Sequence, residues 1–360
     1  MRGGVTVVLA WLVAALSSPV AAAGGHPLVV TSIPDVVPIV ETLAGDSVEC
    51  LSVLPPGVDP HGFSVSADTV VGLRRARLMV YTNSAFLHFE RHLRESLAGV
   101  PAVDWPDYQA HGARLLDFPG LPQTFHGFWL DWTNARAIAR ALADALPGLG
   151  VDSALVQARL AQFEHEVSAL EATSAALVEA AGLKGAAFVV ADACLVYTVS
   201  NMGYRVGSVL MTEGAGALSG RQLAQVVERL KSGELAGVVC PDSMRDSKLG
   251  EVSRQVAHDG HSRVIYARFL QPTAGASSYL SEAYYNVAAL TAAAPEPARS
   301  ASAAVPPGCP WRLAGAVLAA ALVAIGWLAA RLRSCRRGRA EVAGAGIFEG
   351  PRWDDWRHRR

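Results

Sequence analysis

The sequence predicts an α/β protein with two lobes, each a parallel β-sheet flanked by helices, joined by one long rigid helix and followed by a C-terminal transmembrane helix. Three observations support this prediction. Short apolar runs rich in β-branched residues alternate with helical patterns, one much longer helical pattern divides these runs into two groups, and an uncharged apolar stretch lies near the C-terminus. Near-continuous apolar strands that alternate with helices are typical of parallel sheets covered on both faces.

Residues 1–23 are predicted to be a signal peptide. Arg2 precedes the apolar run 5–16, and Ala21-Ala22-Ala23 supplies the small residues that a signal peptidase requires. No Cys follows this region, so we do not expect a lipid anchor at the N-terminus.

Seven apolar runs predict the strands of the two lobes. The first lobe is expected over residues 24–150 and the second over residues 183–292. The runs are 28–32, 47–54, 78–82, 187–191, 206–211, 235–240 and 263–267.

Residues 151–182 are predicted to form the helix between the lobes. Its apolar positions step by four and three, interrupted at Ser174, while Asp152 can cap its start and Gly182 can end it. The apolar positions are Val156, Leu160, Phe163, Val167, Leu170, Leu177 and Ala181. A helix of about 29 residues is roughly 43 Å long, which suits a strut better than a flexible hinge. Because ligands of α/β sheets bind outside the carboxyl ends of the strands, we expect a ligand cleft between the lobes.

The C-terminal segments predict a membrane anchor. A Pro/Ala/Ser-rich linker over residues 293–310 leads into a transmembrane helix over 311–331, of which residues 313–330 carry no charge. The tail, residues 332–360, is rich in Arg and predicts a cytoplasmic C-terminus by the positive-inside rule. The sequence thus predicts a single-pass protein of the cell membrane whose N-terminal part is extracytoplasmic.

Charge and cysteine content exclude several classes of protein. The whole chain has 31 Lys+Arg and 32 Asp+Glu, which gives no basic surface for nucleic acid. Residues 24–310 alone hold 20 Lys+Arg and 28 Asp+Glu, an acidic body that would weakly attract dications. The five Cys include no C-x-x-C spacing and cannot form a dense disulfide scaffold.

Two histidines are candidate metal ligands. His61 ends a Pro-rich turn that follows the strand ending at Leu54, and His126 lies just before a helix that starts near Thr133. Imidazole nitrogens are preferred ligands of zinc and neighbouring metals, and two of them from separate loops can converge across a cleft.

These two segments resemble motifs of a known family. Residues 54–61, Leu-Pro-Pro-Gly-Val-Asp-Pro-His, resemble the L-P-x-G-x-D-P-H motif of the zinc/manganese solute-binding proteins of ABC importers (the ZnuA, TroA and adhesin-B type). Residues 126–131, His-Gly-Phe-Trp-Leu-Asp, resemble its H-x-W-L-D motif with one extra residue. The resemblance covers roughly residues 27–290 and implies that His61 and His126 are metal ligands. It also implies zinc or manganese as the transported ligand, an ABC permease as partner, and an interlobe helix that limits lobe movement.

The second lobe departs from the family pattern. Asp192 stands where the resemblance implies a His ligand, and a carboxylate favours harder ions such as manganese. Ala267, followed by Arg268, stands where the family has a carboxylate ligand. Asp242 lies after the strand ending at Cys240 and is the candidate replacement. The predicted ligand set is therefore His61, His126, Asp192 and Asp242. Cys194 and Cys240 lie near the same strand ends and are weaker candidates, either as ligands or as a disulfide pair.

Enzyme functions find no support in the sequence, and we predict a binding protein that acts as a monomer. His165-Glu166 lacks the second His of H-E-x-x-H, and no nucleophile elbow, P-loop or dinucleotide motif is present. His258-x-x-His261 is interpreted as a solvated turn. One alternative is the same fold with a degenerate metal site, binding a chelated metal or another small solute, or serving in adhesion. A metal-sensing receptor is a weaker alternative, because the tail of about 30 residues is too short for a domain.

Overall fold

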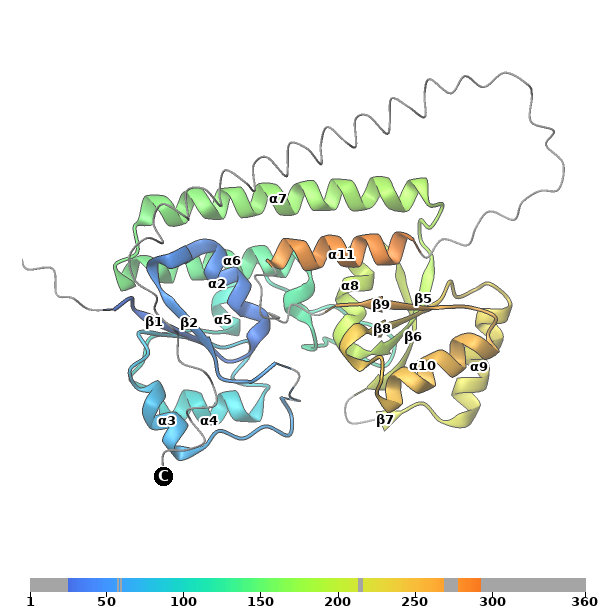
Figure 1. Ribbon diagram of the computed structural model, residues 1–360, viewed down its shortest axis with the longest axis horizontal. Coiled ribbons are helices and arrows are strands. Elements are labelled where there is room, and N and C mark those ends of the chain that lie inside the picture. Colours follow the sequence, from blue (N-terminus) through green and yellow to red (C-terminus); the bar gives the residue numbers. More distant parts are fainter. Residues whose placement is uncertain (1–24, 57, 59, 213–215, 269–277, 293–360) are drawn as a thin grey trace, which may run out of the picture. The chain divides into compact units, whose positions relative to one another are not determined.

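The first lobe contains a parallel β-sheet in the part of the chain that the structure describes. The structure is a computed structural model that describes residues 25–56, 58, 60–212, 216–268 and 278–292 (Figure 1). Within them the first sheet has the strand order β2-β1-β3-β4, with all pairs parallel. Its strands are β1 (Leu28–Thr31), β2 (Glu49–Ser52), β3 (Leu78–Val80) and β4 (Ala102–Val103).

The second sheet repeats this order and adds one antiparallel edge strand. Its order is β7-β6-β5-β8-β9, in which only the β6–β7 pair is antiparallel. Its strands are β5 (Ala187–Asp192), β6 (Arg205–Thr212), β7 (Gly216–Ala217), β8 (Val238–Pro241) and β9 (Val264–Ala267). All seven predicted strands are present, with bounds shifted by up to three residues; β4 and β7 were not predicted.

Helices flank both sheets, which confirms the predicted α/β class. In the first lobe they are α2 (Val37–Ala44), α3 (Ala67–Leu73), α4 (His88–Ser96), α5 (Trp105–Ala110) and α6 (Trp132–Ala145). In the second they are α8 (Val196–Asn201), α9 (Gly220–Lys231), α10 (Lys248–Asp259) and α11 (Tyr279–Thr291). Short 3-10 turns, η1 to η6, cover Pro34–Val36, Gly45–Ser47, Phe128–Leu130, Leu146–Leu149, Ala193–Leu195 and Asp242–Met244.

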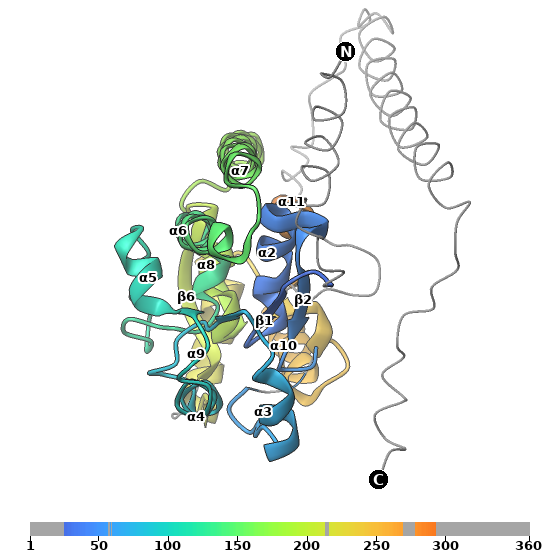
Figure 2. The same cartoon turned by 90° about the vertical axis from the view of Figure 1, so that its left-hand side faces the viewer.

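The helix between the lobes, α7, spans Ser153–Ala180 and has 28 residues. The Asp152 carboxylate accepts a hydrogen bond from the Leu155 N–H, and the chain leaves the helix at Gly182 with φ of +66°. Both predicted ends are confirmed. Helix α7 packs against α6, α2 and α11, and Figure 2 shows it end-on beside α6.

The buried face of α7 differs from the prediction at its C-terminal end. Ser174 and Val178 are buried, whereas Leu177 is 41% exposed. The helical period carries the buried stripe from Leu170 to Ser174 and on to Val178, and position 177 falls outside it. The choice of Leu177 was wrong because side-chain hydrophobicity was given more weight than helical spacing.

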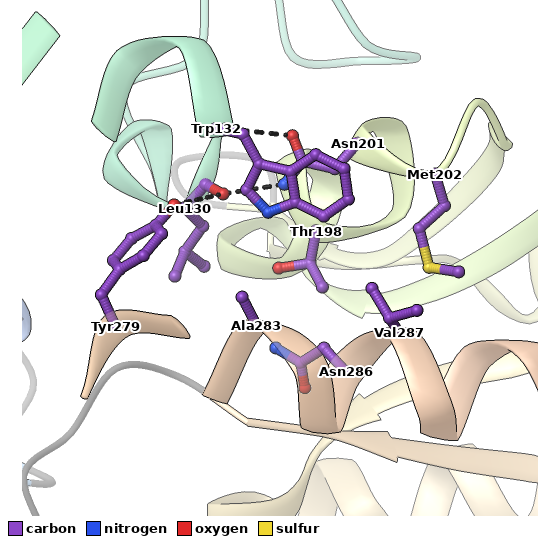
Figure 3. A pocket seen from close by; sticks show the side chains of 9 residues that line it. All are labelled: Leu130, Trp132, Thr198, Asn201, Met202, Tyr279, Ala283, Asn286 and Val287. Atoms are coloured by element: carbon purple, nitrogen blue, oxygen red, sulfur yellow. Dashed lines mark hydrogen bonds between the residues drawn. The ribbon is translucent and has the colours of Figure 1, made fainter. Parts of the chain in front are cut away.

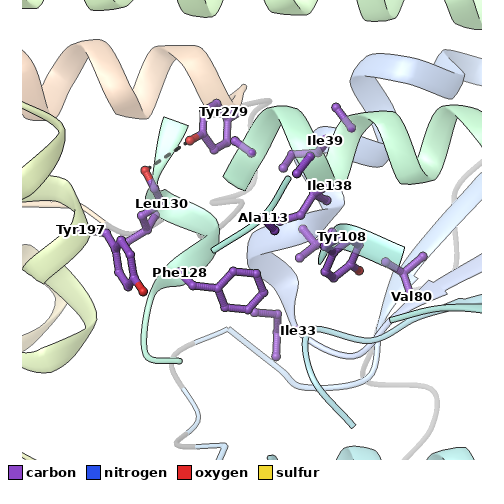
Figure 4. Close-up of a cluster of buried hydrophobic side chains, with 14 of the residues drawn as sticks. Ile33, Ile39, Val80, Tyr108, Ala113, Phe128, Leu130, Ile138, Tyr197 and Tyr279 are labelled. Atoms are coloured by element: carbon purple, nitrogen blue, oxygen red, sulfur yellow. Dashed lines mark hydrogen bonds between the residues drawn. The ribbon is translucent and has the colours of Figure 1, made fainter. Parts of the chain in front are cut away.

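The second sheet is apolar on both faces, and alternation of side chains assigns its residues to each face. Val189 and Cys240 belong to a buried cluster under α9 and α10, whereas Val190 and Val239 belong to the main core. That main core is continuous from the first lobe into the second and includes Phe128, Tyr197 and Tyr279 (Figure 4). Asp192 lies two residues after Val190 on the same strand and therefore on the face of the main core.

The predicted chain ends lie outside the described residues. These are the signal peptide (1–23), the linker (293–310), the transmembrane helix (311–331) and the basic tail (332–360). Within the described ranges, no helix combines the length and the apolar character that crossing a membrane requires.

Candidate metal centre

Both sheets have a topological switch point, where the connections from adjacent strands run in opposite directions. In the order β2-β1-β3-β4 this point lies between β1 and β3, and in the second sheet it lies between β5 and β8. Ligands of such sheets bind outside the carboxyl ends of the strands at the switch point. Asp192 ends β5 and Asp242 follows β8, so the two predicted carboxylate ligands flank the switch point of the second lobe.

The two predicted histidine ligands lie together. His61 is exposed in the loop between β2 and α3, and His126 is half-buried in the loop before η3. Their ring centroids are 5.3 Å apart, with 56° between the ring planes. The backbone N–H of His126 donates a hydrogen bond of 3.3 Å to Thr124 Oγ1. This bond fixes the local conformation of the loop. Loops that are 65 residues apart in the sequence therefore bring two imidazoles to one place.

Gly127, the residue after His126, has a packing role. Gly127 has φ of +70°, and a Cβ at this position would collide with the carbonyl oxygen of Cys194 in the second lobe. Only glycine allows both this left-handed backbone and this close approach. Gly127 therefore allows the His126 loop to lie directly against the second lobe.

Asp192 is the predicted carboxylate of the second lobe whose charge acts on His126. Its Oδ1 accepts a hydrogen bond of 2.9 Å from the Cys194 N–H, which orients the side chain at the start of η5. Burial and the charge of nearby His61 lower the pKa of His126 to about 4, and the negative charge of Asp192 opposes this shift. The His126 imidazole is therefore neutral at physiological pH, the form that binds metal.

Asp242 has different partners. Its Oδ1 accepts a hydrogen bond of 2.8 Å from Arg245 Nη2, and its Oδ2 lies 3.7 Å from Arg268 Nε. The Arg245 and Arg268 guanidinium groups lie over the rings of Tyr266 and Tyr285, with Cζ-to-centroid distances of 3.7 and 3.8 Å. A metal ion would have to compete with two guanidinium groups for this carboxylate.

The remaining sequence candidates lie elsewhere. Cys240 is a buried free thiol on the α9/α10 side of the sheet, so the structure contains no Cys194–Cys240 disulfide. His258 lies in the last turn of α10, not in a turn as predicted, because the helix continues to Asp259. His258 is exposed, and its Nδ1 lies 3.2 Å from Asp259 Oδ1.

Aromatic rings surround the histidine pair, and sequence analysis missed them. The Phe86 ring stacks on Phe125 at a centroid distance of 4.8 Å and presents its edge to His126 at 5.4 Å. Trp105, at the start of α5 in the same lobe, makes an edge-to-face contact with Phe125 at a centroid distance of 5.5 Å. Phe86 follows shortly after the carboxyl end of β3, and that position was the only signal in the sequence.

Hydrogen bonds connect the lobes close to the His126 loop. The Tyr197 hydroxyl of α8 donates to the Thr124 carbonyl at 2.7 Å and accepts from the Leu116 N–H at 3.0 Å. The Asn201 amide bonds the backbone of Leu130 and Trp132 (Figure 3). A cavity of about 20 Å³ lies beside this contact, large enough for one water. Its lining has no His, Cys, Asp or Glu, so it is not the metal site.

The predicted ligands are of types that suit a transition metal, but they do not yet form a complete coordination site. Two imidazoles and a carboxylate match the preferences of zinc and manganese. Within the described ranges, however, no group of three or more His, Cys, Asp or Glu side chains is arranged to hold a metal ion. Side-chain rearrangement would have to accompany binding.

Comparison with known proteins identifies the family. The family model described as the periplasmic component A of the zinc-uptake complex matches residues 29–293. The chain belongs to this family. It is a family of solute-binding proteins of transport systems and not of enzymes, and the predicted resemblance is confirmed.

Individual relatives agree with this assignment. The zinc-binding protein TroA of Treponema pallidum is 38% identical over 81 residues, which are 22% of this chain and 25% of that protein. The match thus spans a quarter of the curated relative. A periplasmic metal-binding protein from Candidatus Liberibacter asiaticus, whose solved forms include Mn-bound and Cd-bound ones, has a TM-score of 0.60 at 16% identity, covering 74% of this chain and 99% of its own. The laminin-binding adhesin of Streptococcus agalactiae has a TM-score of 0.62 at 18% identity with the same coverage. These structures show the fold.

Proposed function

We propose that the protein captures a divalent transition metal, zinc or manganese, between its lobes and delivers it to the permease of an ABC importer. It would act as a monomer outside the cytoplasm, held at the cell membrane by a single transmembrane helix over residues 311–331. His61, His126 and Asp192 would bind the metal. Asp242 would become the fourth ligand only on leaving Arg245 and Arg268.

The observation that carries this proposal is the position of His126. Its ring lies 5.3 Å from that of His61, and it is close enough to Asp192 for that carboxylate to influence its pKa. The two imidazoles of the first lobe thus lie together, and the charge of a carboxylate from the second lobe acts on one of them. Metal binding at this place would join the lobes through coordination bonds, which suits reversible capture.

The experiment is calorimetric titration of the full-length chain, purified in detergent, with Zn²⁺ and separately with Mn²⁺. We expect one metal per chain, and a loss of binding in His61→Ala. His258→Ala, which removes an exposed imidazole outside the predicted ligand set that lies beside Asp259, serves as the matched control and should bind like the wild type. No binding of either metal, or unchanged binding in His61→Ala, would contradict the proposal.

A second candidate function is capture of a chelated metal on the same fold. The observation that favours it is the pair of guanidinium groups at Asp242, the candidate replacement for the carboxylate ligand that the family has at the position of Ala267. An organic chelator would then complete the coordination shell. Native mass spectrometry of the protein as purified distinguishes the two: bare metal adds the mass of one ion, and a chelate adds that of the organic molecule as well. An adhesive role, like that named for the laminin-binding neighbour, would require neither.

A further inference from the structure

A buried carboxylate in the first lobe lies next to the metal centre without facing it. Glu90 of α4 is fully buried. Its Oε1 accepts hydrogen bonds from the Thr82 N–H at 3.0 Å and from Thr82 Oγ1 at 2.6 Å, and its Oε2 accepts one from the Asn83 N–H at 2.8 Å. Burying a charged group is costly, and burial raises the pKa of Glu90. Such a group is retained where its hydrogen bonds define a conformation that matters.

These hydrogen bonds define the path of the loop after β3. The Asn83 side chain accepts from the Ala85 N–H at 3.1 Å, and the Asn83 carbonyl accepts from the Phe86 N–H at 3.0 Å. The Ser84 N–H bonds the Asp104 carboxylate at 3.0 Å. The backbone from Thr82 to Phe86 is therefore bonded at each residue, and Glu90 is the group on which the first two residues depend.

The loop ends on the ring that touches both predicted histidine ligands. The Phe86 ring lies edge-to-face with the rings of His126 and His61, at centroid distances of 5.4 and 6.4 Å and interplanar angles of 71° and 85°. Its opposite contact is the stacked ring of Phe125. Phe86 is nevertheless 40% exposed, so core packing does not hold it in place, and its backbone must.

We propose that Glu90 is a positioning residue for the metal centre: through Thr82 and Asn83 it sets Phe86, and Phe86 orients the imidazoles of His61 and His126. This proposal rests on the proposed function for its effect on metal affinity. Groups that orient metal ligands from behind typically change affinity by about 10- to 100-fold when removed.

The test is Glu90→Gln, which keeps the shape of the side chain. A glutamine has one acceptor oxygen and one NH₂ group, so its NH₂ must face the N–H of Thr82 or of Asn83, donor against donor. In the full-length chain we expect zinc affinity to fall by about 10-fold. Phe86→Ala should have a similar effect, and the double variant should be no weaker than the weaker single one, because both changes interrupt the same path. Phe86→Tyr, which keeps the ring, should retain wild-type affinity.

A variant that is destabilised elsewhere on α4 shows whether a loss of zinc affinity in Glu90→Gln arises from misplaced ligands or only from lower stability. Leu93 is buried on the same helix, α4, and Leu93→Ala leaves the hydrogen bonds of Glu90 in place. We expect it to lower the unfolding midpoint without changing zinc affinity. If Glu90→Gln does not fold, Thr82→Val removes only the Oγ1 hydrogen bond and should still weaken zinc binding relative to Leu93→Ala.

The imidazole ¹⁵N signals of the metal-free protein test the same path without metal. The signals of His61 and His126, assigned by His61→Gln and His126→Gln, should shift in Glu90→Gln and remain in place in Leu93→Ala. This measurement can be made even if the wild type binds neither zinc nor manganese. The proposed role of Glu90 and the proposed metal binding are therefore tested independently. Unchanged imidazole signals in Glu90→Gln, or additive losses of affinity in the double variant, would overturn the role of Glu90.

Discussion

The side-chain amide of Asn201 in the second lobe donates a hydrogen bond of 2.8 Å to the carbonyl oxygen of Leu130 in the first. The same amide accepts a hydrogen bond of 3.2 Å from the Trp132 N–H. One side chain thus satisfies two backbone groups on either side of Asp131, the residue that caps α6. The segment that follows His126 is therefore bonded to a residue from the other lobe.

Replacing Asn201 should therefore destabilise the junction between the lobes. Asn201→Ala leaves the Leu130 carbonyl and the Trp132 N–H without these partners, and we expect a loss of about 1–3 kcal/mol in the free energy of unfolding, measured by urea denaturation. Asn286→Ala is the matched control for stability, because its amide bonds only the backbone of Arg268 within the second lobe. Both variants should lose stability, but only Asn201→Ala should weaken zinc binding. Equal zinc affinity in the two variants would show that the junction does not position the His126 loop.

Gly127→Ala should disrupt the packing of the His126 loop against the second lobe. The added Cβ meets the Cys194 carbonyl and forces an alanine into a backbone with φ of +70°. Gly112→Ala is matched for backbone strain, since φ there is +94° but nothing lies within 4 Å of the added Cβ. We expect Gly127→Ala to be clearly less stable than Gly112→Ala in thermal unfolding and to lose zinc affinity. Equal stability would mean that the loop does not pack on Cys194.

The stability of the metal-free protein should fall as the pH drops from about 6.5 to about 4. The folded-state pKa of His126 is about 4, below its ordinary value of 6.5, so the unfolded chain binds more protons in this window. The contribution of His126 is fully present above pH 6.5 and is lost as the pH falls toward 4. His126→Gln should flatten the stability profile in this range relative to the wild type, as measured by urea denaturation at several pH values. Parallel profiles for the two proteins would contradict the burial of a neutral imidazole.

Ser174 should be better replaced by alanine. Its hydroxyl is buried in the face of α7 that packs on the core and has no hydrogen-bond partner in the described part of the chain. Ser174→Ala removes an unsatisfied polar group and should raise the free energy of unfolding by about 1 kcal/mol. Ser168→Ala makes the same change at an exposed position of the helix, but it also removes a hydroxyl that accepts from Arg136 Nη2 and donates to the Glu164 carbonyl, so it should gain no stability. A loss of stability in Ser174→Ala relative to Ser168→Ala would contradict this prediction.

Sequence periodicity was sufficient to predict the α/β fold, but it did not predict the short strands β4 and β7 at the edges of the sheets. The seven predicted strands contain enough apolar residues to form a pattern, whereas β4 and β7 have two residues each and show no period. The ends of α7 were predictable because Asp152 and Gly182 act locally. The burial of Ser174 follows from helical spacing, which continues the buried stripe from Leu170 to Val178, and it was missed because serine is polar.

Residues of the candidate site could be predicted only where a motif within a single loop identifies them. His61 and His126 could be predicted as candidate ligands from their motifs, and the structure brings their rings together. The role of Gly127 depends on the carbonyl of Cys194, a contact between lobes that no local pattern contains. The Arg245 partner of Asp242 lies three residues on and could have been anticipated, since residues at this spacing are neighbours on one side of a helical turn.

The two carboxylate candidates should differ in their effect on metal binding. Asp192 acts on His126, whereas Asp242 is paired with Arg245 and Arg268. We expect Asp192→Asn to reduce zinc affinity more than Asp242→Asn does, when both are measured by competition with a chelating indicator. A larger effect of Asp242→Asn would mean that this carboxylate leaves its arginines when metal binds.

The central claim is that one metal ion binds between the lobes at His61, His126 and Asp192. Its most direct test is anomalous diffraction at the metal absorption edge from crystals of the full-length chain loaded with zinc. We predict one strong peak about 2.0–2.1 Å from an imidazole nitrogen of each histidine and about 2.0–2.2 Å from a carboxylate oxygen of Asp192. A peak at His258 and His261 with none at this site would contradict the account.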